Sequence, residues 1–299
     1  MMPPTAIVTG GTGFVGSYLV RRLVADGWNV HSIVRPESKL LLLQDILDRI
    51  TLHVHDGSTN HMLQILKMAK PAVVFHLASL FLAQHEPKDI EPMMQSNLMF
   101  GTQLVEAMVA NGVSRLINTG TSWQHYENKE YSPVCLYAAT KQAFQNILQF
   151  YTEATPLKVI TLKLFDTYGA GDPRPKLFSV LRKHSKQLEP LSMSPGEQFM
   201  DLVYIDDVVT AFILAARRIQ NEDGKANEEF AVSSGHRIQL KHLVETYRRV
   251  VGKPLQIQWG VRPYRFREVM APWNTGQRLP GWEPMMQLEE GIRRMEGME

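Results

Sequence analysis

A run of closely spaced glycines near the start of the chain constrains its fold more than any other feature. Gly10, Gly13 and Gly16 follow an apolar segment at 6–8 and precede a run with helical periodicity at 17–26. Between a strand and a helix, such glycines allow a tight turn, close approach of a pyrophosphate to the backbone, and close packing of the helix on the strand. The free amide N–H groups at the start of the helix then favour an anion. The segment predicts a dinucleotide site, rather than a glycine-rich turn without a ligand, at Gly10, Thr12, Gly13, Phe14, Val15 and Gly16.

The pattern after these glycines is an alternation of short apolar runs with longer amphipathic ones. Continuous apolar runs are typical of strands buried on both faces of a parallel sheet, and the helices between them make the crossovers. The sequence therefore predicts an α/β fold with a Rossmann-type, doubly wound parallel sheet. The predicted strands are 6–8, 30–34, 51–54, 72–77, 115–118 and 159–165.

The pattern changes after Tyr168, where loops rich in glycine and proline interrupt the alternation. A chain of 299 residues is long enough for a second unit. We expect a dinucleotide-binding domain over 1–168, to which 201–233 returns. A smaller C-terminal substrate-binding lobe is expected over 169–200 and 234–299.

Composition excludes several classes of protein. Hydrophobic residues make up 44% and charged residues 21% of the chain, which is typical of a globular protein and not of a disordered one. The net charge of +2 is not gathered into a basic stripe, so we expect no nucleic-acid partner. The single Cys135, the absence of a signal peptide and the absence of a long apolar run predict a cytoplasmic protein without a membrane span. His76, His125 and His184 lack metal-ligand spacing, and no metal site is predicted.

Three segments that follow predicted strands are placed to contact the dinucleotide, since ligands bind beyond the carboxyl ends of the strands in open parallel sheets. The second strand ends at Arg35, where an acidic residue would favour NAD, so NADP(H) is preferred and NAD(H) stays possible. Asp56 and Gly57 follow the third strand and are placed near the adenine amine. A solvated Arg35 and an Asp-Gly turn without a ligand remain alternatives. The residues expected beside the pyrophosphate and the nicotinamide ribose are Leu77, Ala78 and Ser79.

Tyr137 and Lys141 are spaced so that they share one face of a helix. A nearby ammonium favours the phenolate and lowers the pKa of a phenol, so we expect Tyr137 to act as an acid or base near neutral pH. We expect Lys141 also to hold the nicotinamide ribose. A hydroxyl that polarises a substrate carbonyl is expected at the end of the fifth strand, where Thr121 and Ser122 are alternatives. Both hydroxyls would otherwise only satisfy backbone groups in a turn.

Further motifs accompany these residues, namely His76-Leu77-Ala78, Asn97 with Gly101-Thr102, Tyr168-Gly169, Tyr204-Ile205-Asp206-Asp207-Val208 and Gly281-Trp282-x-Pro284. Together they resemble the extended short-chain dehydrogenase/reductase superfamily, in its NAD-dependent epimerase/dehydratase group, over nearly the whole chain. The resemblance implies a nucleotide-sugar substrate and a homodimer formed through the helices around Asn97 and Tyr137. Family members carry the hydroxyl residue four positions before a tyrosine. Counting back from Tyr126 favours Ser122 over Thr121.

The resemblance also narrows the reaction. Dehydratases of this group carry an Asp-Glu pair after the hydroxyl residue, whereas Trp123 and Gln124 stand here and cannot act as acid or base. The segment 196–207 is similar to the 4-ketoreductases that make CDP-abequose and CDP-paratose. We therefore expect NADPH-dependent reduction of the C4 ketone of a nucleotide-linked 4-keto-6-deoxyhexose, as in deoxysugar and O-antigen biosynthesis. The alternatives are a nucleotide-sugar 4-epimerase with bound NAD, a reductase of non-sugar carbonyls, and a non-catalytic NADP-binding sensor.

The residues expected to bind the substrate are Ser122, Trp123 and Arg267. Arg267 is preferred to Arg262 because Arg267-Glu268 lines up with an arginine and glutamate pattern of the reductases, although a solvated or Glu-paired arginine is an alternative. The chain departs from the family at three positions, where Lys163, Asp166 and Met200 replace the common Arg, Asn and Arg. A carboxylate beside a diphosphate is unfavourable, so the resemblance leaves the role of Asp166 open.

Overall fold

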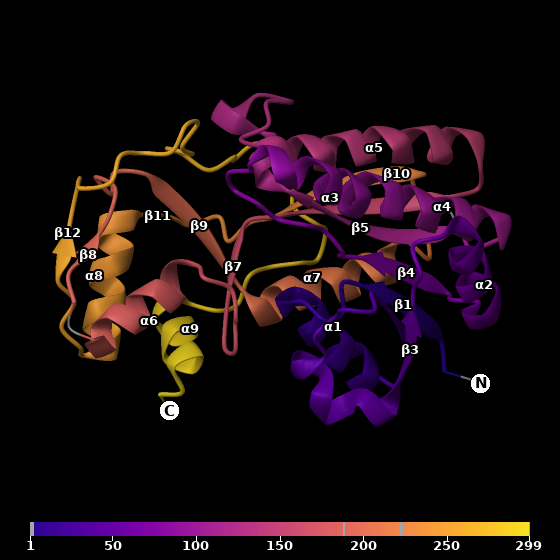
Figure 1. Cartoon of the computed structure of the whole chain (residues 1–299), viewed down its shortest axis with the longest axis horizontal. Coiled ribbons are helices and arrows are strands. Elements are labelled where there is room, and N and C mark those ends of the chain that lie inside the picture. The colour runs from indigo at the N-terminus through magenta and orange to yellow at the C-terminus, as the bar shows by residue number, and fades with distance from the viewer. Residues whose placement is uncertain (1–2, 188, 222–223, 299) are drawn as a thin grey trace.

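The computed structural model describes residues 3–187, 189–221 and 224–298, and a seven-stranded sheet forms its base (Figure 1). The strand order is β10-β6-β5-β4-β1-β2-β3, and every neighbouring pair is parallel. The order confirms the predicted doubly wound α/β fold, in which the strands run outward from β1 in both directions. The strands are β1 Thr5–Thr9, β2 Asn29–Val34, β3 Ile50–Val54, β4 Val73–His76, β5 Arg115–Thr121, β6 Lys158–Leu164 and β10 Asn227–Val232.

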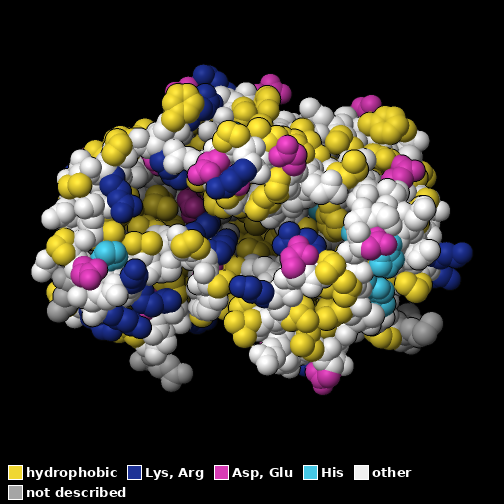
Figure 2. Space-filling view, viewed as in Figure 1, with side chains coloured by type: hydrophobic (Ala, Val, Ile, Leu, Met, Phe, Trp, Pro, Cys, Tyr) yellow, Lys and Arg dark blue, Asp and Glu magenta, His cyan; other side chains and the backbone are white. Residues whose placement is uncertain are grey.

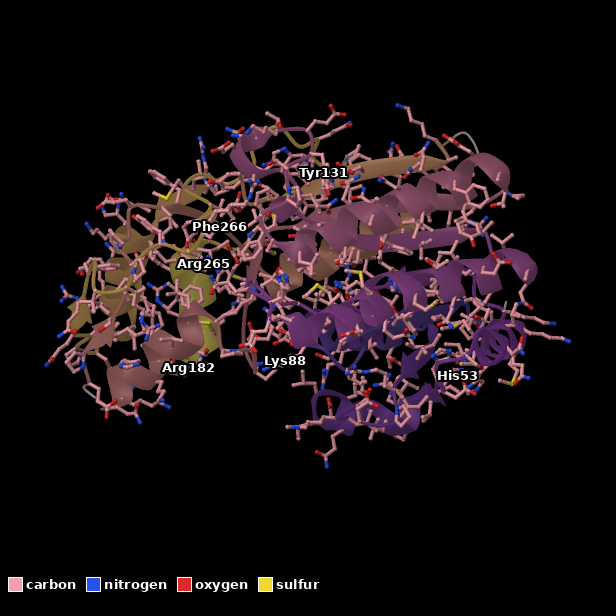
Figure 3. The ribbon with its side chains drawn as sticks, turned by 45° about the horizontal axis from the view of Figure 1, so that its top comes forward. His53, Lys88, Tyr131, Arg182, Arg265 and Phe266 are labelled. Atoms are coloured by element: carbon pink, nitrogen blue, oxygen red, sulfur yellow. The ribbon has the colours of Figure 1, made fainter. Side chains whose placement is uncertain are left out.

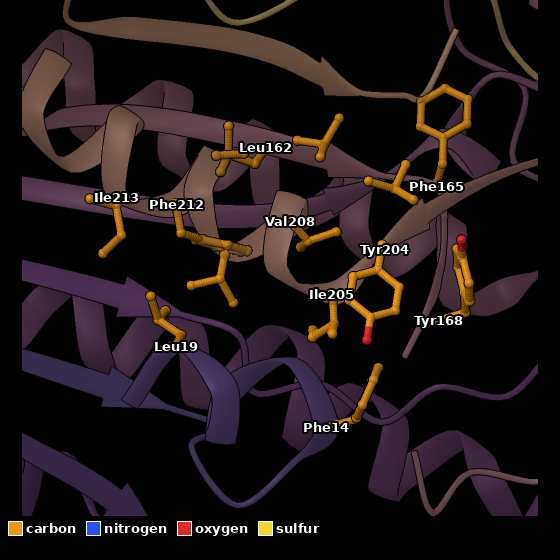
Figure 4. Packing of buried hydrophobic residues seen from close by; sticks show 14 of the residues in the cluster. Phe14, Leu19, Leu162, Phe165, Tyr168, Tyr204, Ile205, Val208, Phe212 and Ile213 are labelled. Carbon is orange, nitrogen blue, oxygen red and sulfur yellow. The ribbon is translucent and has the colours of Figure 1, made fainter. Parts of the chain in front are cut away.

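Helices cover both faces of this sheet and bury two separate hydrophobic clusters. One face carries α1 Phe14–Ala25 and α7 Ile205–Arg218, and the other carries α2 Thr59–Ala69, α4 Phe100–Ala110 and α5 Leu136–Ala154. The central strands of the sheet are buried on both faces, as in β4, whose four residues are all buried. The cluster under α1 and α7 continues past the sheet edge through Phe165, Tyr168 and Tyr204 (Figure 4).

A smaller lobe lies beyond the carboxyl ends of β5 and β6 (Figure 1). Its three-stranded sheet has the order β11-β9-β7, with β7 Asp166–Tyr168, β9 Phe199–Tyr204 and β11 Arg237–Gln239. The predicted return segment 201–233 thus includes most of β9, which pairs in the small sheet, as well as α7 and β10. The remaining elements of the lobe are α6 Leu177–Gln187, β8 Leu191–Ser192, α8 Leu240–Val251, β12 Ile257–Gln258 and α9 Leu288–Glu296.

Short helical segments complete the chain. The π-helical turn η3, Gln95–Met99, joins α3 to α4 without a break. The other short elements are η1 Leu41–Arg49, η2 Pro87–Asp89, α3 Ile90–Met94, η4 Ser122–Gln124 and η5 Tyr126–Asn128. Within the described part of the chain, no helix combines the length and the apolar character needed to cross a membrane.

Candidate active site

The glycine loop packs so tightly that side chains would not fit at its ends. Gly10 has a φ of +72°, and a Cβ there would lie 2.6 Å from the backbone nitrogen of Ala78. A Cβ at Gly16 would lie 2.1 Å from the carbonyl oxygen of Gly10. Gly13 is the N-cap of α1, so the helix begins at Phe14, earlier than the sequence predicts, and Phe14 and Val15 form its first turn. The backbone N–H groups of that turn are free to bind a phosphate, which fits a dinucleotide.

A cavity of about 540 Å³ extends from this loop along the ends of the neighbouring strands. Its volume is within the usual range for a cofactor site. Phe14, Val15 and Gly16 do not line it, because the Phe14 ring is buried in the core and the other two lie in the helix. The predicted cofactor residues that do line it are Gly10, Thr12, Gly13, Arg35, Asp56, Gly57, Leu77, Ala78 and Ser79.

The charged residues at the far end of this cofactor cavity are already paired. The Nε of Arg35 lies 3.1 Å from Oε1 of Glu37, and both side chains are exposed. Glu37 also lines the cavity, although the sequence analysis did not single it out. Oδ1 of Asp56 accepts a hydrogen bond of 2.8 Å from the Ser58 N–H, and these Ser58 contacts lower the pKa of Asp56. Asp56 therefore stabilises its own turn at the edge of the cavity.

Tyr137 lies in the first turn of α5, and Lys141 follows one turn later, as the spacing predicts. The Lys141 Nζ is 5.9 Å from the centre of the Tyr137 ring. Burial lowers the pKa of Lys141 to about 8, and its ammonium makes no hydrogen bond to any residue in the described ranges. Burial also raises the pKa of Tyr137, and the opposing effects of Ser79 and Arg174 are smaller. The expectation that Tyr137 has a lowered pKa is therefore wrong in this structure, because desolvation of the phenolate outweighs the nearby positive charge.

Asn97 connects the cofactor cavity to the helix that carries Tyr137 and Lys141. Its Oδ1 accepts hydrogen bonds from the Leu80 N–H at 2.7 Å and from the Ser79 hydroxyl at 3.2 Å. Its Nδ2 donates to the Thr140 Oγ1 at 2.9 Å, on the α5 turn between the tyrosine and the lysine. Asn97 is buried in the π-helical turn, and this network fixes the loop after β4 against α5.

The two candidate hydroxyls at the end of β5 have different surroundings. The Thr121 Oγ1 accepts a hydrogen bond of 3.3 Å from the Trp123 N–H and thereby caps η4. Ser122 lines a cavity of about 190 Å³, the Ser122 cavity, between the sheet and the smaller lobe. Gln124 is fully buried and donates to Gln142 at 2.7 Å and to Gln145. Thr121 and Gln124 therefore stabilise the turn, and Ser122 is the hydroxyl that faces open space.

Another cavity, of about 350 Å³, adjoins the Ser122 cavity and is called the Arg174 cavity. Figure 2 shows the surface hollowed between the main part and the smaller lobe, with hydrophobic walls and both signs of charge at the edges. Trp123 lines both cavities, and the Phe81 ring centre lies 5.6 Å from that of Trp123 and 4.9 Å from that of Tyr137. Phe81, which the sequence analysis missed, thus lies directly beside the phenol. The residues common to both cavities are Trp123, Asp166, Leu177, Met200 and Arg265.

Arg267 does not line any of these cavities. Its guanidinium lies 4.2 Å from the centre of the Tyr126 ring, and its Nη2 donates a hydrogen bond of 2.7 Å to the Ser132 Oγ. Arg265 lines both cleft cavities instead, and Glu268 holds it through hydrogen bonds of 2.9 and 2.7 Å. Figure 3 shows Arg265 beside Phe266, whose side chain is 87% exposed. The two arginines are two residues apart, and the backbone at Arg267 is left-handed, with a φ of 56°.

Lys163 is buried below the Ser122 cavity. Its Nζ lies 2.6 Å from Oε1 of Glu229 and 2.5 Å from Nε2 of His125. The His125 ring lines the cavity and stacks on Trp273 with a centre distance of 3.9 Å. Burial lowers the pKa of both Lys163 and His125, so the imidazole is neutral. Its two nitrogens are hydrogen bonded to the Lys129 carbonyl and to the Lys163 Nζ. The described residues include no cluster of three or more His, Cys, Asp or Glu side chains that is arranged to hold a metal ion.

Comparisons with known proteins agree with this geometry. Residues 6–232 match the model of the NAD dependent epimerase/dehydratase family. The CDP-abequose synthase of Salmonella muenchen is 25% identical over 98% of this chain and 97% of its own. The dTDP-6-deoxy-L-talose 4-dehydrogenase (NAD(P)(+)) of Kitasatospora kifunensis is 26% identical over 98% and 95%.

Solved structures show the same fold. The UDP-glucose 4-epimerase of Thermotoga maritima superimposes with a TM-score of 0.85 at 23% identity, covering 98% of both chains. The UDP-glucuronic acid 4-epimerase of Bacillus cereus gives a TM-score of 0.86 at 21% identity, again over 98% of both. The fold of this chain is thus shared with these structures, and the chain belongs to the NAD-dependent epimerase/dehydratase family of extended short-chain dehydrogenases/reductases.

Proposed function

We propose that this chain reduces the C4 ketone of a nucleotide-linked 4-keto-6-deoxyhexose with NADPH. Two relatives with matching length support the substrate class, since their names specify a CDP-linked and a dTDP-linked deoxysugar. The proposal keeps Tyr137, Lys141 and Ser122 as the catalytic residues. It adds Arg265 and Lys176 as ligands of the diphosphate, because both line the Arg174 cavity.

The placement of Tyr137 carries the choice of a reductase, because its ring packs against Phe81 at 4.9 Å on the helix that carries Lys141, and burial there raises the pKa of the phenol. Its raised pKa keeps the phenol protonated at neutral pH, which suits an acid that gives a proton to a forming alkoxide. An epimerase needs the same residue as a base in its first, oxidising half-reaction. When bound, NADPH supplies the hydride. The Ser122 hydroxyl donates a hydrogen bond to the ketone oxygen, and the Lys141 ammonium stabilises the phenolate that remains after proton transfer.

The turn after Ser122 supports the same choice. Elimination of water across C5 and C6 needs an acid–base pair beside the hydroxyl residue, and the positions that follow are Trp123 and Gln124. Gln124 is fully buried, with its amide committed to α5 and to the backbone of Thr121. This turn supplies neither the acid nor the base for dehydration.

A nucleotide-sugar 4-epimerase with bound NAD is the second candidate. Several relatives bear that name, and Glu37 in the cofactor cavity is an acid of the kind that binds a ribose hydroxyl. We still prefer NADPH, because Arg35 provides a cation at the same place. A non-catalytic sensor would have no use for a buried phenol and ammonium on one helix.

We also propose a homodimer formed through the helices around Asn97 and Tyr137. Met99 and Phe150 on these helices are large apolar side chains that are more than half exposed. Pairing of two copies through these helices would cover them. A cytoplasmic location stays our proposal.

The test is a panel of nucleotide-linked 4-keto-6-deoxyhexoses, each supplied with NADPH and with NADH. We expect NADPH consumption in equal amount to the reduced sugar. An ordinary nucleotide-linked hexose without added cofactor should stay unchanged. Formation of a C4 epimer or a 4-keto product from that second mixture would overturn the assignment.

A further inference from the structure

Asp166 is an acidic residue shared by the two cavities of the cleft. It is the first residue of β7, lies at the junction of the Ser122 and Arg174 cavities, and lines both of them. Its side chain is 36% exposed, and its carboxylate accepts no hydrogen bond from the residues that the structure describes. A carboxylate with free lone pairs at this place is available to a ligand that enters either cavity.

The other carboxylates of the two cavities are engaged by neighbours. Glu268 holds Arg265 at 2.7 Å, and Asp172 holds the guanidinium of Arg174, also at 2.7 Å. Asp201 accepts hydrogen bonds from the side chains of Ser233 and Ser234 and from the Ser234 backbone. Among the described lining residues, Asp166 is thus the acid that a ligand can reach without breaking an existing hydrogen bond.

Two cations face Asp166 without hydrogen bonding to it. Lys176 Nζ is 3.9 Å from the nearest carboxylate oxygen, which is an ion pair at the limit of contact. The Arg265 guanidinium is in electrostatic contact with Asp166 while it stays bonded to Glu268. A diphosphate between Lys176 and Arg265 would be attracted by both cations and repelled by Asp166. The carboxylate therefore lowers the affinity for the phosphates unless another part of the ligand makes a compensating contact with it.

Hydroxyl groups of the sugar can make this compensating contact. A carboxylate accepts hydrogen bonds from hydroxyl groups, and hydrogen bonds to an ionised acceptor are stronger than neutral ones. Ser122 and Trp123, where the hexose reacts, line the same cavity as Asp166. We propose that Asp166 is a specificity-determining residue that accepts hydrogen bonds from ring hydroxyls of the hexose, and that Lys176 and Arg265 hold the diphosphate. This inference rests on the nucleotide-sugar part of the proposed function and not on the direction of the reaction.

The proposal predicts changes of opposite sign for two parts of one ligand. In Asp166→Ala, a nucleoside diphosphate should bind more tightly, by about 3-fold to 10-fold, because the repulsion is gone. The gain in affinity that the sugar provides should fall by about 10-fold or more, because the hydroxyls lose their charged acceptor. A residue that only supports the fold would weaken both ligands together.

The experiment is a calorimetric titration of the full chain saturated with NADP+. The probes are UDP with UDP-galactose, CDP with CDP-glucose, and dTDP with dTDP-glucose, and the quantity compared is the ratio of the two dissociation constants in each pair. Asp166→Asn is the isosteric variant and should show the same signs with a smaller loss. Asp172→Asn is the matched control, because its carboxylate is bonded to Arg174, and it should leave the ratio unchanged. Circular dichroism melting confirms that each variant is folded.

Each remaining outcome contradicts a defined part of the argument. Parallel weakening of diphosphate and sugar nucleotide by Asp166→Ala would show that the residue only positions Lys176 and Arg265. An unchanged ratio would show that no hydroxyl reaches it. Either result overturns the inference and leaves the ketoreductase proposal intact. Normal sugar-nucleotide binding without reduction of any 4-keto sugar would overturn the ketoreductase proposal alone, and no binding of any probe would overturn both.

Discussion

The cofactor half and the substrate half of this cleft are built in different ways. The cofactor cavity is lined mainly by short stretches at the ends of β1, β2, β3 and β4, and residues of α3, η3 and α4 complete it. The cleft between the sheet and the smaller lobe is lined by Phe81, Trp123, Asp166, Lys176 and Arg265, which come from five separated segments. The first half is encoded locally by motif and spacing. The second half exists only after the chain has folded.

Removal of the acid should have the largest effect and tests the point where the two halves meet. Tyr137→Phe should lower turnover by about 10²-fold to 10⁴-fold, because the alkoxide loses its proton donor. Cofactor affinity should stay nearly unchanged, since the ring and its packing on Phe81 are retained. Steady-state kinetics and NADPH fluorescence titration measure the two quantities. Near-normal turnover would refute the acid role.

The buried Lys141 predicts how stability depends on pH on the cofactor side. Its pKa is about 8 in the folded chain, whereas the ordinary value of 10.5 applies to the unfolded chain. Between these two pH values the unfolded chain therefore binds one more proton than the folded chain. Stability should therefore rise from pH 8 to 10.5 by about 3 kcal/mol from this residue. Urea unfolding of the wild type and of Lys141→Met measures the difference. An equally steep rise in the variant would contradict the assignment.

Arg35 tests the identity of the cofactor. Arg35→Ala should weaken NADPH binding by about 1.5–3 kcal/mol, as for a charge-assisted hydrogen bond, and leave NADH unchanged. Glu37→Gln is the complementary variant, because it releases Arg35 from its ion pair and should tighten NADPH binding. Fluorescence titration with NADPH and with NADH measures the two affinities for each variant. Equal losses for NADPH and NADH would exclude a contact between Arg35 and the 2′-phosphate.

A pair of neighbouring arginines tests the substrate half with the smallest expected effect. Arg265→Ala should weaken UDP, CDP or dTDP binding by about 10-fold, because a charged hydrogen bond to the diphosphate is lost. Arg267→Ala should change it less than 2-fold, since that guanidinium packs on Tyr126. Calorimetry on both variants makes the comparison. A larger effect of Arg267 would restore the choice made from the sequence.

The cofactor half and the substrate half also differ in how well the sequence predicts them. The glycine loop and the strand ends predicted the fold and nine of the residues that line the cofactor cavity, because these positions lie next to predicted strands. They did not predict the raised pKa of Tyr137, which depends on burial by distant segments such as Phe81. The motif resemblance favoured Arg267 over Arg262 and did not point to Arg265, which lines both cleft cavities. Arg267 has a left-handed backbone, and such a conformation at an arginine has no sequence signal.

Two very short crossings connect the main sheet to the smaller lobe. β6 ends at Leu164 and β7 begins at Asp166, while β9 ends at Tyr204 and α7 begins at Ile205. Because β7 and β9 also pair with each other, the loops between and after them start and end at fixed points. These loops can change length and chemistry during evolution without moving Tyr137 or the glycine loop. Such an architecture separates the reacting residues from these loops, so the loops beside the cleft can differ while Asp166 and Tyr137 keep their places.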